Sequence, residues 1–523
     1  MKNLPIGISV LSKMSQNNYI YVDKTHHIAN LANSGEFYFL SRPRRFGKSL
    51  LIDTLKQAFS GNKQLFNGLY LENNWDWSVS YPIIHFDFGG SSSLDSEQVL
   101  LDMIIPTLED VAELYQVKLR SELSIGQALQ WLIRDIYKKH GKKVVLLIDE
   151  YDKPILDCIT DTQQAVKMRE MLKQLYSVIK ANDTYLKFVF LTGVSKFSKV
   201  SLFSGLNNLN DISLDGKYAD ICGYTQSELE THFADYLTAG NVDRNELKKW
   251  YNGYNFAGLE KQKVYNPFDI LLFFAKNYQY TNYWFETATP TFLIELIKTG
   301  NYFMPNLENI IIPDHVLNNF DVEKIRLTTL LFQTGYLTIK QVINDIDGCS
   351  YQLTYPNFEV KLSLNRHILD MTSSETSDYA YSSQRIELKQ QLLLNNFSII
   401  QELLTSHFAS IPHDWYRNNK IAEYEGFYAS VVYSYFTALG YDLVAEDATN
   451  HGRIDLSITM PDKILLIEFK LSTNGDAISA LEQIKNKNYA QKYLDAGKPI
   501  YAIGMSFDAT NRNVVDLVSE QLN

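Results

Sequence analysis

The stretch that decides the fold is FYFLSRPRRFGKS, residues 37–49, which runs from an apolar segment into a glycine–lysine–serine loop. Residues 37–40 have the composition of a short strand, and residues 50–59 have the apolar spacing of a helix. A loop in this position can bind phosphate, because its backbone N–H groups and the helix N-terminus point toward an anion. The sequence therefore predicts a phosphate-binding loop over residues 41–49.

Two side chains of this loop have the chemistry that a nucleotide requires. Lys48 would reach the β- and γ-phosphates, and the hydroxyl of Ser49 would bind Mg²⁺. Arg42 occupies the position at which the full pattern has its first glycine. Because Gly-Lys-Ser alone is common by chance, the interpretation needs a second motif.

An apolar strand that ends in two carboxylates supplies this second motif. Residues 144–150 read VVLLIDE and begin about 100 residues after the loop. Asp149 at the carboxyl end of the strand can hold the Mg²⁺ shell, and Glu150 can polarise the attacking water. An acidic turn that caps the strand is the alternative, but its pairing with the Gly-Lys-Ser loop favours nucleotide binding.

A third strand ends in polar residues. After the apolar run 187–191 the chain reads TGVSK, in which Thr192 or Ser195 could sense the γ-phosphate. An ordinary turn at the end of a strand is an equal alternative. Lys196 and Lys199 could serve as cationic fingers, but nothing in the spacing singles them out.

The order of these segments predicts an α/β fold. Strands at 37–40, 82–88, 144–148 and 187–191 alternate with helices, which is the pattern of a parallel sheet covered by helices. From about residue 225 the chain becomes helical and rich in aromatic residues. A second α/β region begins near residue 397.

Within the helical middle we expect helices at 227–237, 246–251, 267–276, 291–298 and 322–336, a strand at 337–342, and a linker or exposed loop at 372–385. The expected division is a phosphate-loop core at 1–220, a helical lid and middle region at 221–390, and a smaller α/β domain at 391–523.

The composition excludes several classes of protein. The 523 residues include 49 Lys and Arg against 60 Asp and Glu, a net charge of −11, which excludes a polybasic nucleic-acid binder. Three cysteines far apart in the chain predict neither a disulfide framework nor a zinc site. The first 14 residues lack a signal-peptide core, and no apolar run approaches the ~20 residues of a membrane span. We therefore expect a cytoplasmic protein that does not enter a membrane.

Two strands near the C-terminus form a predicted hairpin. Residues 452–459 alternate between polar and apolar, and residues 464–470 (ILLIEFK) form the second strand. A tight turn would place Asp455 opposite Glu468 on one face, with Cβ atoms about 4.5–5.5 Å apart. Lys470 lies two residues further on and shares that face.

Opposed carboxylates repel one another unless a cation or a proton lies between them. Mg²⁺ held by Asp455, Glu468 and the carbonyl of Phe469 would satisfy this requirement, since hard divalent ions take oxygen ligands. Lys470 could then orient or deprotonate a water that attacks a phosphodiester. An exposed hairpin on which Lys470 neutralises Glu468 is the alternative.

Six motifs of the first 290 residues belong together: 21–25 (YVDKT), 42–49 (RPRRFGKS), 149–154 (DEYDKP), 192–196 (TGVSK), 203–209 (FSGLNNL) and 250–254 (WYNGY). They resemble the AAA-ATPase-like family of bacterial proteins, whose members also carry arginine and proline in place of the early loop glycines. The resemblance implies a P-loop NTPase fold that binds ATP and Mg²⁺.

The resemblance assigns the nucleotide to Arg45, Phe46, Gly47, Lys48, Ser49, Asp149, Thr192 and Ser195. Ser49 and Asp149 would hold the metal, and Glu150 would be the catalytic residue. The cluster Arg42, Arg44 and Arg45 is expected to serve nucleotide phosphates rather than DNA. Residues 21–25 contact the base or ribose, or form a surface turn.

The hairpin resembles the PD-(D/E)XK nuclease superfamily, over about residues 410–510. This resemblance implies a restriction-endonuclease-like fold in which Asp455, Glu468 and Lys470 are catalytic and the two carboxylates bind Mg²⁺. Glu425 matches the acidic position of the preceding helix, and Gln483 matches the polar position of the following one.

Other positions of this domain match less closely. Lys485, Lys487 and Tyr489 would face a phosphate backbone or complete the site. Ile454 replaces the nominal proline of the superfamily.

The leading hypothesis is therefore an ATP-binding and ATP-hydrolysing module that controls a Mg²⁺-dependent nuclease acting on nucleic acid, with DNA preferred over RNA. Residues 391–523 contain 10 Lys and Arg against 16 Asp and Glu, a net of −6, so other regions, an oligomer or an activated state would have to supply basic surface. The alternatives are a nucleotide-dependent interaction switch whose C-terminal domain binds without cleaving, and a scaffold that has lost hydrolysis. Assembly into a homo-oligomer stays open.

Overall fold

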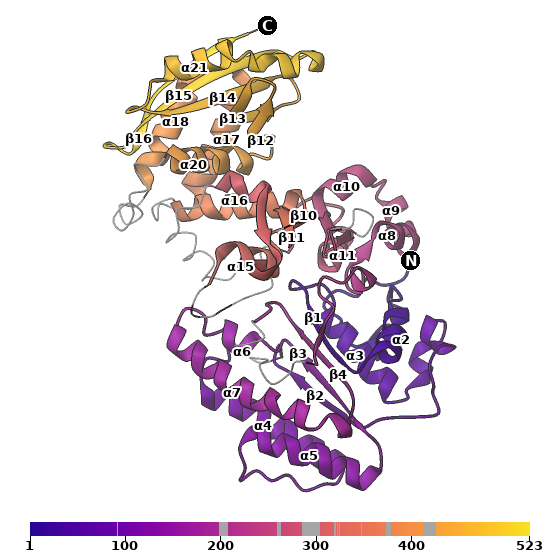
Figure 1. Cartoon of the computed structure of the whole chain (residues 1–523). Helices are drawn as coiled ribbons and strands as arrows, with labels where there is room; N and C mark the ends of the chain where they lie inside the picture. Colours follow the sequence, from indigo (N-terminus) through magenta and orange to yellow (C-terminus); the bar gives the residue numbers. More distant parts are fainter. Residues whose placement is uncertain are drawn as a thin grey trace. The chain divides into compact units, whose positions relative to one another are not determined.

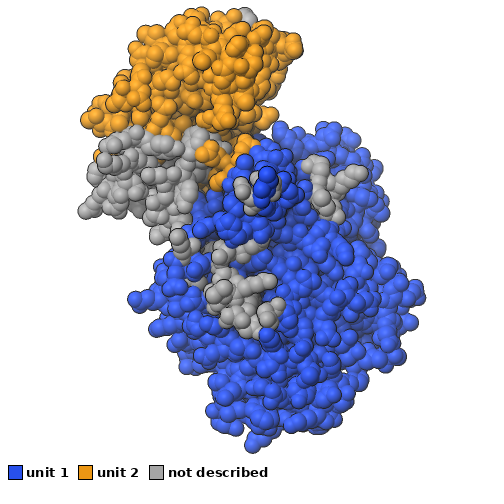
Figure 2. Space-filling view, viewed as in Figure 1, with its two compact units in different colours: residues 1–288, 311–358 blue, residues 289–310, 359–523 orange. Residues whose placement is uncertain are grey.

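The computed structural model describes residues 1–90, 93–197, 208–258, 263–284, 304–317, 321, 323, 325–346, 348–372, 378–411 and 425–522 (Figure 1). The chain divides into two compact units (Figure 2). Unit 1 contains residues 1–288 and 311–358, and unit 2 contains residues 289–310 and 359–523. The three-part division expected from the sequence stays a prediction.

A five-stranded parallel sheet forms the centre of unit 1. Its strands are β1 (Phe37–Ser41), β2 (Ile83–Asp87), β3 (Val144–Asp149), β4 (Leu186–Gly193) and β5 (Asn210–Asp211), in the order β2-β3-β4-β1-β5. All four pairings are parallel. The predicted α/β fold and its four predicted strands are confirmed, and β4 separates the strand of the phosphate loop from the strand that ends in Asp149.

Helices cover both faces of this sheet. They are α1 (Leu11–Gln16), α2 (Thr25–Ser34), α3 (Lys48–Phe59), α4 (Glu97–Leu114), α5 (Ile125–His140), α6 (Lys153–Leu156) and α7 (Thr162–Ala181). Figure 1 shows α2 and α3 on one side and α4 to α7 on the other. All six residues of β3 are buried, as expected for a parallel strand covered on both faces.

The remainder of unit 1 is mostly helical. Its helices are α8 (Gln226–His232), α9 (Ala234–Ala239), α10 (Arg244–Tyr251), α11 (Pro267–Ala275), α14 (Asp314–Leu317) and α15 (Leu327–Thr334). Two small sheets join them, β6 (Tyr224–Thr225) with β8 (Val264–Tyr265) and β7 (Asn252–Tyr254), and β10 (Thr338–Asp345) with β11 (Gly348–Thr354) and β9 (Ile310–Pro313). The helices expected at 246–251 and 267–276 are present, and the one expected at 227–237 is divided at Phe233 into α8 and α9. The helix expected at 291–298 lies outside the described residues.

Two expectations for this middle region are wrong in part. The helix expected at 322–336 begins only at Leu327, because Arg326 is extended, and it ends where Gly335 takes the left-handed conformation. The stretch expected as a loop at 372–385 contains the end of α16 (Phe358–Thr372) and the first part of α17 (Asp378–Leu394).

Tertiary contacts stabilise α17. Leu388 and Leu392 are buried, and the buried Lys463 ammonium donates to the carbonyls of Leu392 at 2.9 Å and Leu393 at 3.0 Å. A lysine that satisfies the last carbonyls stabilises the C-terminus of a helix. The polar composition at the start of α17 concealed this arrangement.

A mixed five-stranded sheet forms unit 2. Its strands are β12 (Asp442–Thr449), β13 (Gly452–Thr459), β14 (Ile464–Leu471), β15 (Ile500–Asp508) and β16 (Asn513–Gln521), in sequential order. Only β14 and β15 are parallel, and α21 (Ala477–Asn486) connects them. The other helices of the domain are α18 (Phe397–Ser410) and α20 (Glu425–Ala438).

The hairpin β13–β14 has the predicted register. Thr459 pairs with Ile464, and the ladder continues to the pair Leu456 and Ile467. Beyond that pair the Asp455 carboxylate, rather than a backbone carbonyl, accepts the N–H of Phe469 at 2.8 Å. The strands therefore stop pairing at the position where the two predicted catalytic carboxylates meet.

Candidate functional site

The phosphate loop has the predicted strand–loop–helix context. It leaves β1 at Ser41 and enters α3 at Lys48, with Gly47 as the residue that precedes the helix. Gly47 has φ 92° and Arg45 has φ 69°, so both take the left-handed conformation. A glycine adopts it without strain, whereas an arginine does so only where surrounding structure holds it.

Arg42 is an internal anchor. It is 1% exposed, and its guanidinium donates to the carbonyls of Ser213 at 2.7 Å and Tyr218 at 3.0 Å. The guanidinium also lies over the ring of Phe256, at 4.0 Å from the centroid. The expectation that Arg42 serves nucleotide phosphates is therefore wrong, because its guanidinium is buried and both terminal nitrogens donate to carbonyls of the fold.

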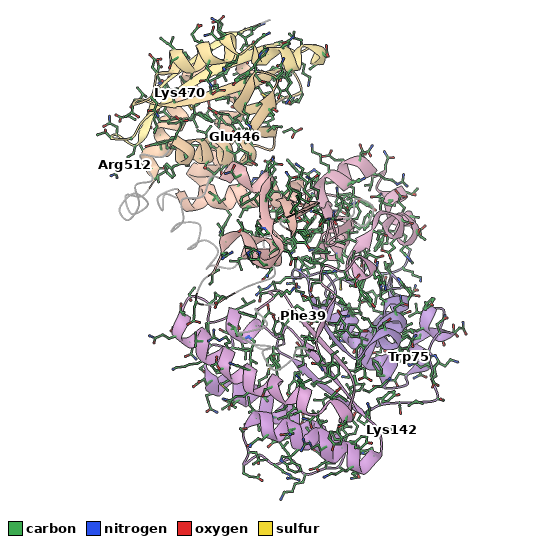
Figure 3. The ribbon with its side chains drawn as sticks, in the orientation of Figure 1. Phe39, Trp75, Lys142, Glu446, Lys470 and Arg512 are labelled. Atoms are coloured by element: carbon green, nitrogen blue, oxygen red, sulfur yellow. The ribbon has the colours of Figure 1, made fainter. Side chains whose placement is uncertain are left out.

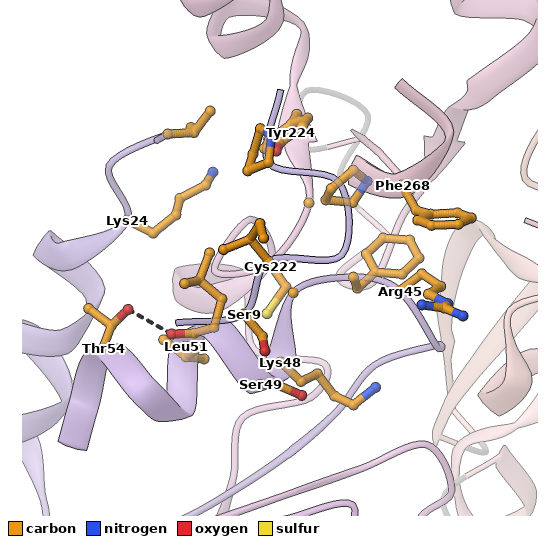
Figure 4. Close-up of a pocket in the computed structure, with 18 of the residues that line it drawn as sticks. Ser9, Lys24, Arg45, Lys48, Ser49, Leu51, Thr54, Cys222, Tyr224 and Phe268 are labelled. Carbon is orange, nitrogen blue, oxygen red and sulfur yellow. Dashed lines mark hydrogen bonds between the residues drawn. The ribbon is translucent and has the colours of Figure 1, made fainter. Parts of the chain in front are cut away.

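Lys48 is held by the loop itself. Its ammonium donates to the carbonyls of Arg42 at 3.0 Å and Pro43 at 3.1 Å, and its side chain is buried. The guanidinium of Arg45 lies over the ring of Phe268 in α11, at 4.7 Å (Figure 4). Phe46 is buried against Tyr254, with ring centroids 4.7 Å apart.

A cavity of about 510 Å³ opens beside this loop. Loop residues 44–49, Glu150 and Lys153 line one part of it. The other part is lined largely by apolar residues from the N-terminal segment, residues 20–22, Cys222, Tyr224 and α11. A polar end with cations and an apolar end suit the phosphates and the base of a nucleotide, respectively.

For residues 21–25 the sequence left open a contact with the base or ribose and a surface turn, and Tyr21, Val22 and Lys24 line the cavity. Sequence reasoning missed Phe268 and Tyr224, which follow no phosphate-loop pattern. Lys24 also joins two segments distant in sequence, since its ammonium contacts the Glu228 carboxylate of α8 at 2.6 Å.

The end of β3 brings three predicted residues together. The hydroxyl of Thr192 donates to Asp149 Oδ1, which also accepts the backbone N–H of Glu150 at 3.0 Å. Glu150 has φ 51° and is half-buried, and this burial raises the pKa of its carboxyl group. Thr192 thus orients Asp149, while Glu150 faces the cavity.

Ser195 lies apart from this group. Its backbone N–H and its hydroxyl donate to Asp152 Oδ2 at 2.6 and 2.5 Å, and it does not line the cavity. Lys196, which the sequence offered as a cationic finger, forms an ion pair with Asp211. Lys199 lies outside the described residues.

In unit 2 the two hairpin carboxylates meet as expected. Glu468 is 1% exposed, and its Oε2 accepts from Gln483 Nε2 in α21 at 2.9 Å. Burial and the neighbouring Asp455 carboxylate raise the pKa of Glu468, while the charge of Lys470 acts in the opposite direction. Gln483 therefore contacts the buried carboxylate of the hairpin, as its match to the following-helix position predicts.

Glu425 joins the same group from the first turn of α20. Its Oε2 accepts the backbone N–H of Leu471 at 3.1 Å. A cavity of about 690 Å³ is lined by Glu425, Asp455 and Phe469, among others. Four predicted side chains are thus brought together from four elements: Glu425 of α20, Asp455 of β13, Glu468 of β14 and Gln483 of α21.

The same cavity has two charged residues that sequence reasoning missed. Glu446 lies in a bulge of β12 with φ 50°, between the pairs Ala445–Leu456 and Asp447–Ile454. Its carboxylate lies 3.8 Å from the guanidinium of the exposed Arg453. Figure 3 labels Glu446 together with Lys470. A bulge with positive φ at a glutamate has no signal in the sequence.

Lys485, Lys487 and Tyr489, expected to face a phosphate backbone or to complete the site, lie in different surroundings, and Tyr489 is near Glu468, Asp455 and Gln483. Lys485 contacts Glu482 and Glu520 at 3.1 Å each, and Lys487 is exposed. Tyr489 is buried and donates its hydroxyl to the Arg453 carbonyl at 2.8 Å. None of the three lines the cavity.

A divalent cation fits the carboxylate pair. Glu468 Oε1 is buried and accepts no hydrogen bond among the described residues, and the available donors are all oxygen atoms, which Mg²⁺ prefers. In the described part of the chain no three His, Cys, Asp or Glu side chains lie close enough to hold one ion. Asp455 and Glu468 would therefore need backbone oxygen or water to complete a coordination shell.

Comparison with known proteins agrees with this two-part arrangement. Residues 5–203 match the model of a predicted AAA-ATPase family, and residues 423–517 match a PD-(D/E)XK nuclease superfamily model. The chain is 46% identical over 524 residues to an uncharacterized protein in the vnfD 5′ region of Azotobacter chroococcum mcd 1, covering 100% of this chain and 99% of that protein. No solved structure matches the chain. Among the described residues, no helix combines the length and the apolar character of a membrane span.

Proposed function

The chain belongs to one family with the Azotobacter protein and carries a predicted AAA-ATPase domain followed by a PD-(D/E)XK nuclease superfamily domain, and on this premise we propose that it binds and hydrolyses ATP to control a Mg²⁺-dependent nuclease. DNA is the proposed substrate. The observation that carries the proposal is the meeting of Asp455, Glu468 and Gln483 beside Glu425.

In the ATP-binding part, the loop binds the phosphates and the end of β3 contributes the acidic residues. Backbone N–H groups of residues 45–49 and the start of α3 bind the phosphates, and Lys48 leaves its two carbonyl acceptors to neutralise them. Ser49 and Asp149 would hold Mg²⁺, which screens the phosphate charge when it is bound. Glu150, whose carboxyl pKa burial raises, accepts a proton from the attacking water.

For the nuclease part, the hairpin supplies the chemistry. Asp455 and Glu468 would hold Mg²⁺, which as a Lewis acid polarises the phosphodiester and its attacking water. Gln483 fixes the Glu468 carboxylate through its amide, and Glu425 is held by the Leu471 amide at the same cavity. Lys470, half-buried beside the pair, orients the water that attacks phosphorus.

We propose that the protein acts in the cytoplasm on nucleic acid, and that the 221–390 region closes over the nucleotide. Because residues 391–523 carry a net charge of −6, other regions, an oligomer or an activated state would supply the basic surface that nucleic acid requires.

The first prediction concerns cleavage of nucleic acid, measured on single- and double-stranded DNA and RNA, with and without ATP and Mg²⁺. The wild-type chain should cleave DNA with Mg²⁺, and EDTA should abolish cleavage. Glu468→Gln and Lys470→Met should each lower the rate by about 10²-fold or more, because each removes a group at the reacting centre.

Matched controls remove the same charges elsewhere. Glu520→Gln alters an exposed glutamate, and Lys389→Met alters an exposed lysine; both should retain wild-type cleavage. DNA binding without cleavage in every condition would reject the nuclease proposal and favour an interaction switch.

A further inference from the structure

The three arginines of the phosphate loop differ in what their guanidinium groups contact. Arg42 is buried and bonded to carbonyls of the fold. Arg45 lies over Phe268. Arg44 is exposed, lines the same cavity as Lys48 and Glu150, and has no ion-pair partner for its guanidinium among the described residues.

The backbone of Arg44 is held firmly although its side chain is not. Its carbonyl accepts from Trp284 Nε1 at 3.1 Å, and Trp284 is fully buried. Next to Trp284, Gly335 lies so close to Pro43 that a Cβ at this position would come within 2.7 Å of the proline ring. The crest of the loop is therefore fixed from outside the cavity, which limits the positions that the Arg44 guanidinium can reach.

Arg44 lies in the part of the cavity that would hold the terminal phosphate of ATP, where hydrolysis takes place. Arg44, Lys48 and Glu150 all line the polar part of the cavity, so both cations lie in the part of the cavity that Glu150 faces. Glu150 is the residue proposed to accept the proton of the attacking water. A cation in this part of the cavity can reach the terminal phosphate, whereas the guanidinium of Arg45 lies over Phe268 of α11.

We propose that Arg44 is a catalytic residue that acts in cis, contacting the terminal phosphate of ATP bound by the same chain. The inference rests on the proposed ATPase function and deepens it. The water oxygen forms a bond to the γ-phosphorus while the bond from phosphorus to the bridging oxygen breaks. The electron pair stays on ADP, one water proton passes to Glu150 and the other remains on the phosphate product.

Arg44 stabilises the negative charge that spreads over the γ-phosphoryl oxygens during this step. An arginine in that role contributes about 10³–10⁵-fold to the rate in other phosphoryl-transfer enzymes, supplied either by the same chain or by a partner. Because Lys196 is already paired with Asp211, it does not compete for this role.

The test compares ATP turnover of the full-length wild type, Arg44→Ala and Arg44→Lys, with Arg244→Ala as an exposed control in unit 1. Arg44→Ala should lower kcat by about 10³-fold, and Arg44→Lys should restore part of the loss. Affinity for ADP, which lacks the terminal phosphate, should stay within about twofold, while affinity for a non-hydrolysable ATP analogue should fall. Unchanged ADP binding also shows that the variant is folded.

Mixing separates action in cis from action in trans. Turnover per chain of the wild type should be independent of protein concentration, and a mixture of Arg44→Ala with Lys48→Ala chains should stay inactive. Recovery of turnover in the mixture, or a wild-type kcat in Arg44→Ala, would overturn the inference alone. No turnover in the wild type would overturn the proposed function and this inference with it.

Discussion

At the scale of single residues, Arg42 shows how the loop dispenses with its usual first glycine. The guanidinium occupies the interior and satisfies the carbonyls of Ser41, Ser213 and Tyr218. Burial lowers the pKa of Arg42 to about 10, which still leaves it charged near neutral pH. The residue that departs from the phosphate-loop pattern is thus a structural link between the loop and residues 213–218.

This arrangement predicts that restoring the glycine damages the protein. Arg42→Gly should lower the free energy of unfolding by about 3 kcal/mol or more, because buried carbonyls of Ser213 and Tyr218 lose charged donors. Arg42→Lys should fall between the two, since one ammonium cannot reach as many acceptors in the same plane.

Urea unfolding followed by circular dichroism measures these differences. Arg44→Gly provides the matched control, because its side chain is exposed, and it should unfold near the wild-type midpoint. An Arg42→Gly chain as stable as the wild type would show that the buried guanidinium is dispensable.

At the scale of elements, α18 buries a titratable side chain in unit 2. His407 is 1% exposed, and its ring stacks on Tyr435 of α20 with centroids 4.8 Å apart. Burial lowers the pKa of His407 to about 4, against about 6.5 in an unfolded chain. Between these values the unfolded chain binds a proton that the folded chain excludes.

Stability should therefore fall as the pH falls from 6.5 to 4, and be fully present above 6.5. The difference approaches about 3 kcal/mol across the window. His407→Phe, which keeps a ring beside Tyr435, should flatten this part of the stability profile, measured as urea midpoints from pH 7.5 to 4.5. His451→Phe alters an exposed histidine and should keep the wild-type slope; parallel curves for all three chains would contradict the prediction.

Some elements could be predicted from the sequence and others could not. The register of β13 and β14 followed from a short turn and strict alternation, so the meeting of Asp455 and Glu468 could be predicted. The helix at 378–385 could not, because Lys463, about 80 residues later, stabilises its far end. The bulge at Glu446 depends on pairing across β12 and β13 and likewise has no local signal.

The separation of site residues has the same physical origin. Lys48, Asp149 and Glu150 lie at the ends of parallel strands or in the loop that follows, where topology brings side chains together. Ser195 is only three residues beyond Thr192, but its hydroxyl bonds to Asp152. Nothing in the string TGVSK distinguishes these two environments.

At the scale of the whole molecule, unit 2 is built from two separate pieces of chain. Glu308, from the earlier piece, contacts the Lys361 ammonium at 2.7 Å and accepts from the hydroxyl of Tyr433. Leu307 beside it is 2% exposed, and Asn306 and Asn309 line the hairpin cavity. Residues 304–310 thus form part of the wall of the proposed nuclease site.

A fragment of residues 359–523 should consequently be less stable than the same fragment joined through a glycine–serine linker to residues 304–310. The expected difference is about 2–4 kcal/mol, since the short segment restores a buried leucine and a partner for Lys361. Chemical unfolding of both fragments measures it. Glu308→Ala in the linked fragment is the control for the ion pair with Lys361. Equal stability of linked and unlinked fragments would show that residues 304–310 do not stabilise unit 2.

The polypeptide passes between the two units three times, at residues 288–289, 310–311 and 358–359. A contiguous gene segment that encodes all of unit 2 therefore also carries residues 311–358 of unit 1. Recombination that carries only the region after residue 358 leaves the recipient to supply its own version of residues 304–310. The wall of the site would then contain residues from two different parent genes. Exchange within this family should therefore favour breakpoints that keep residues 289–523 together, because such a block carries both pieces of unit 2.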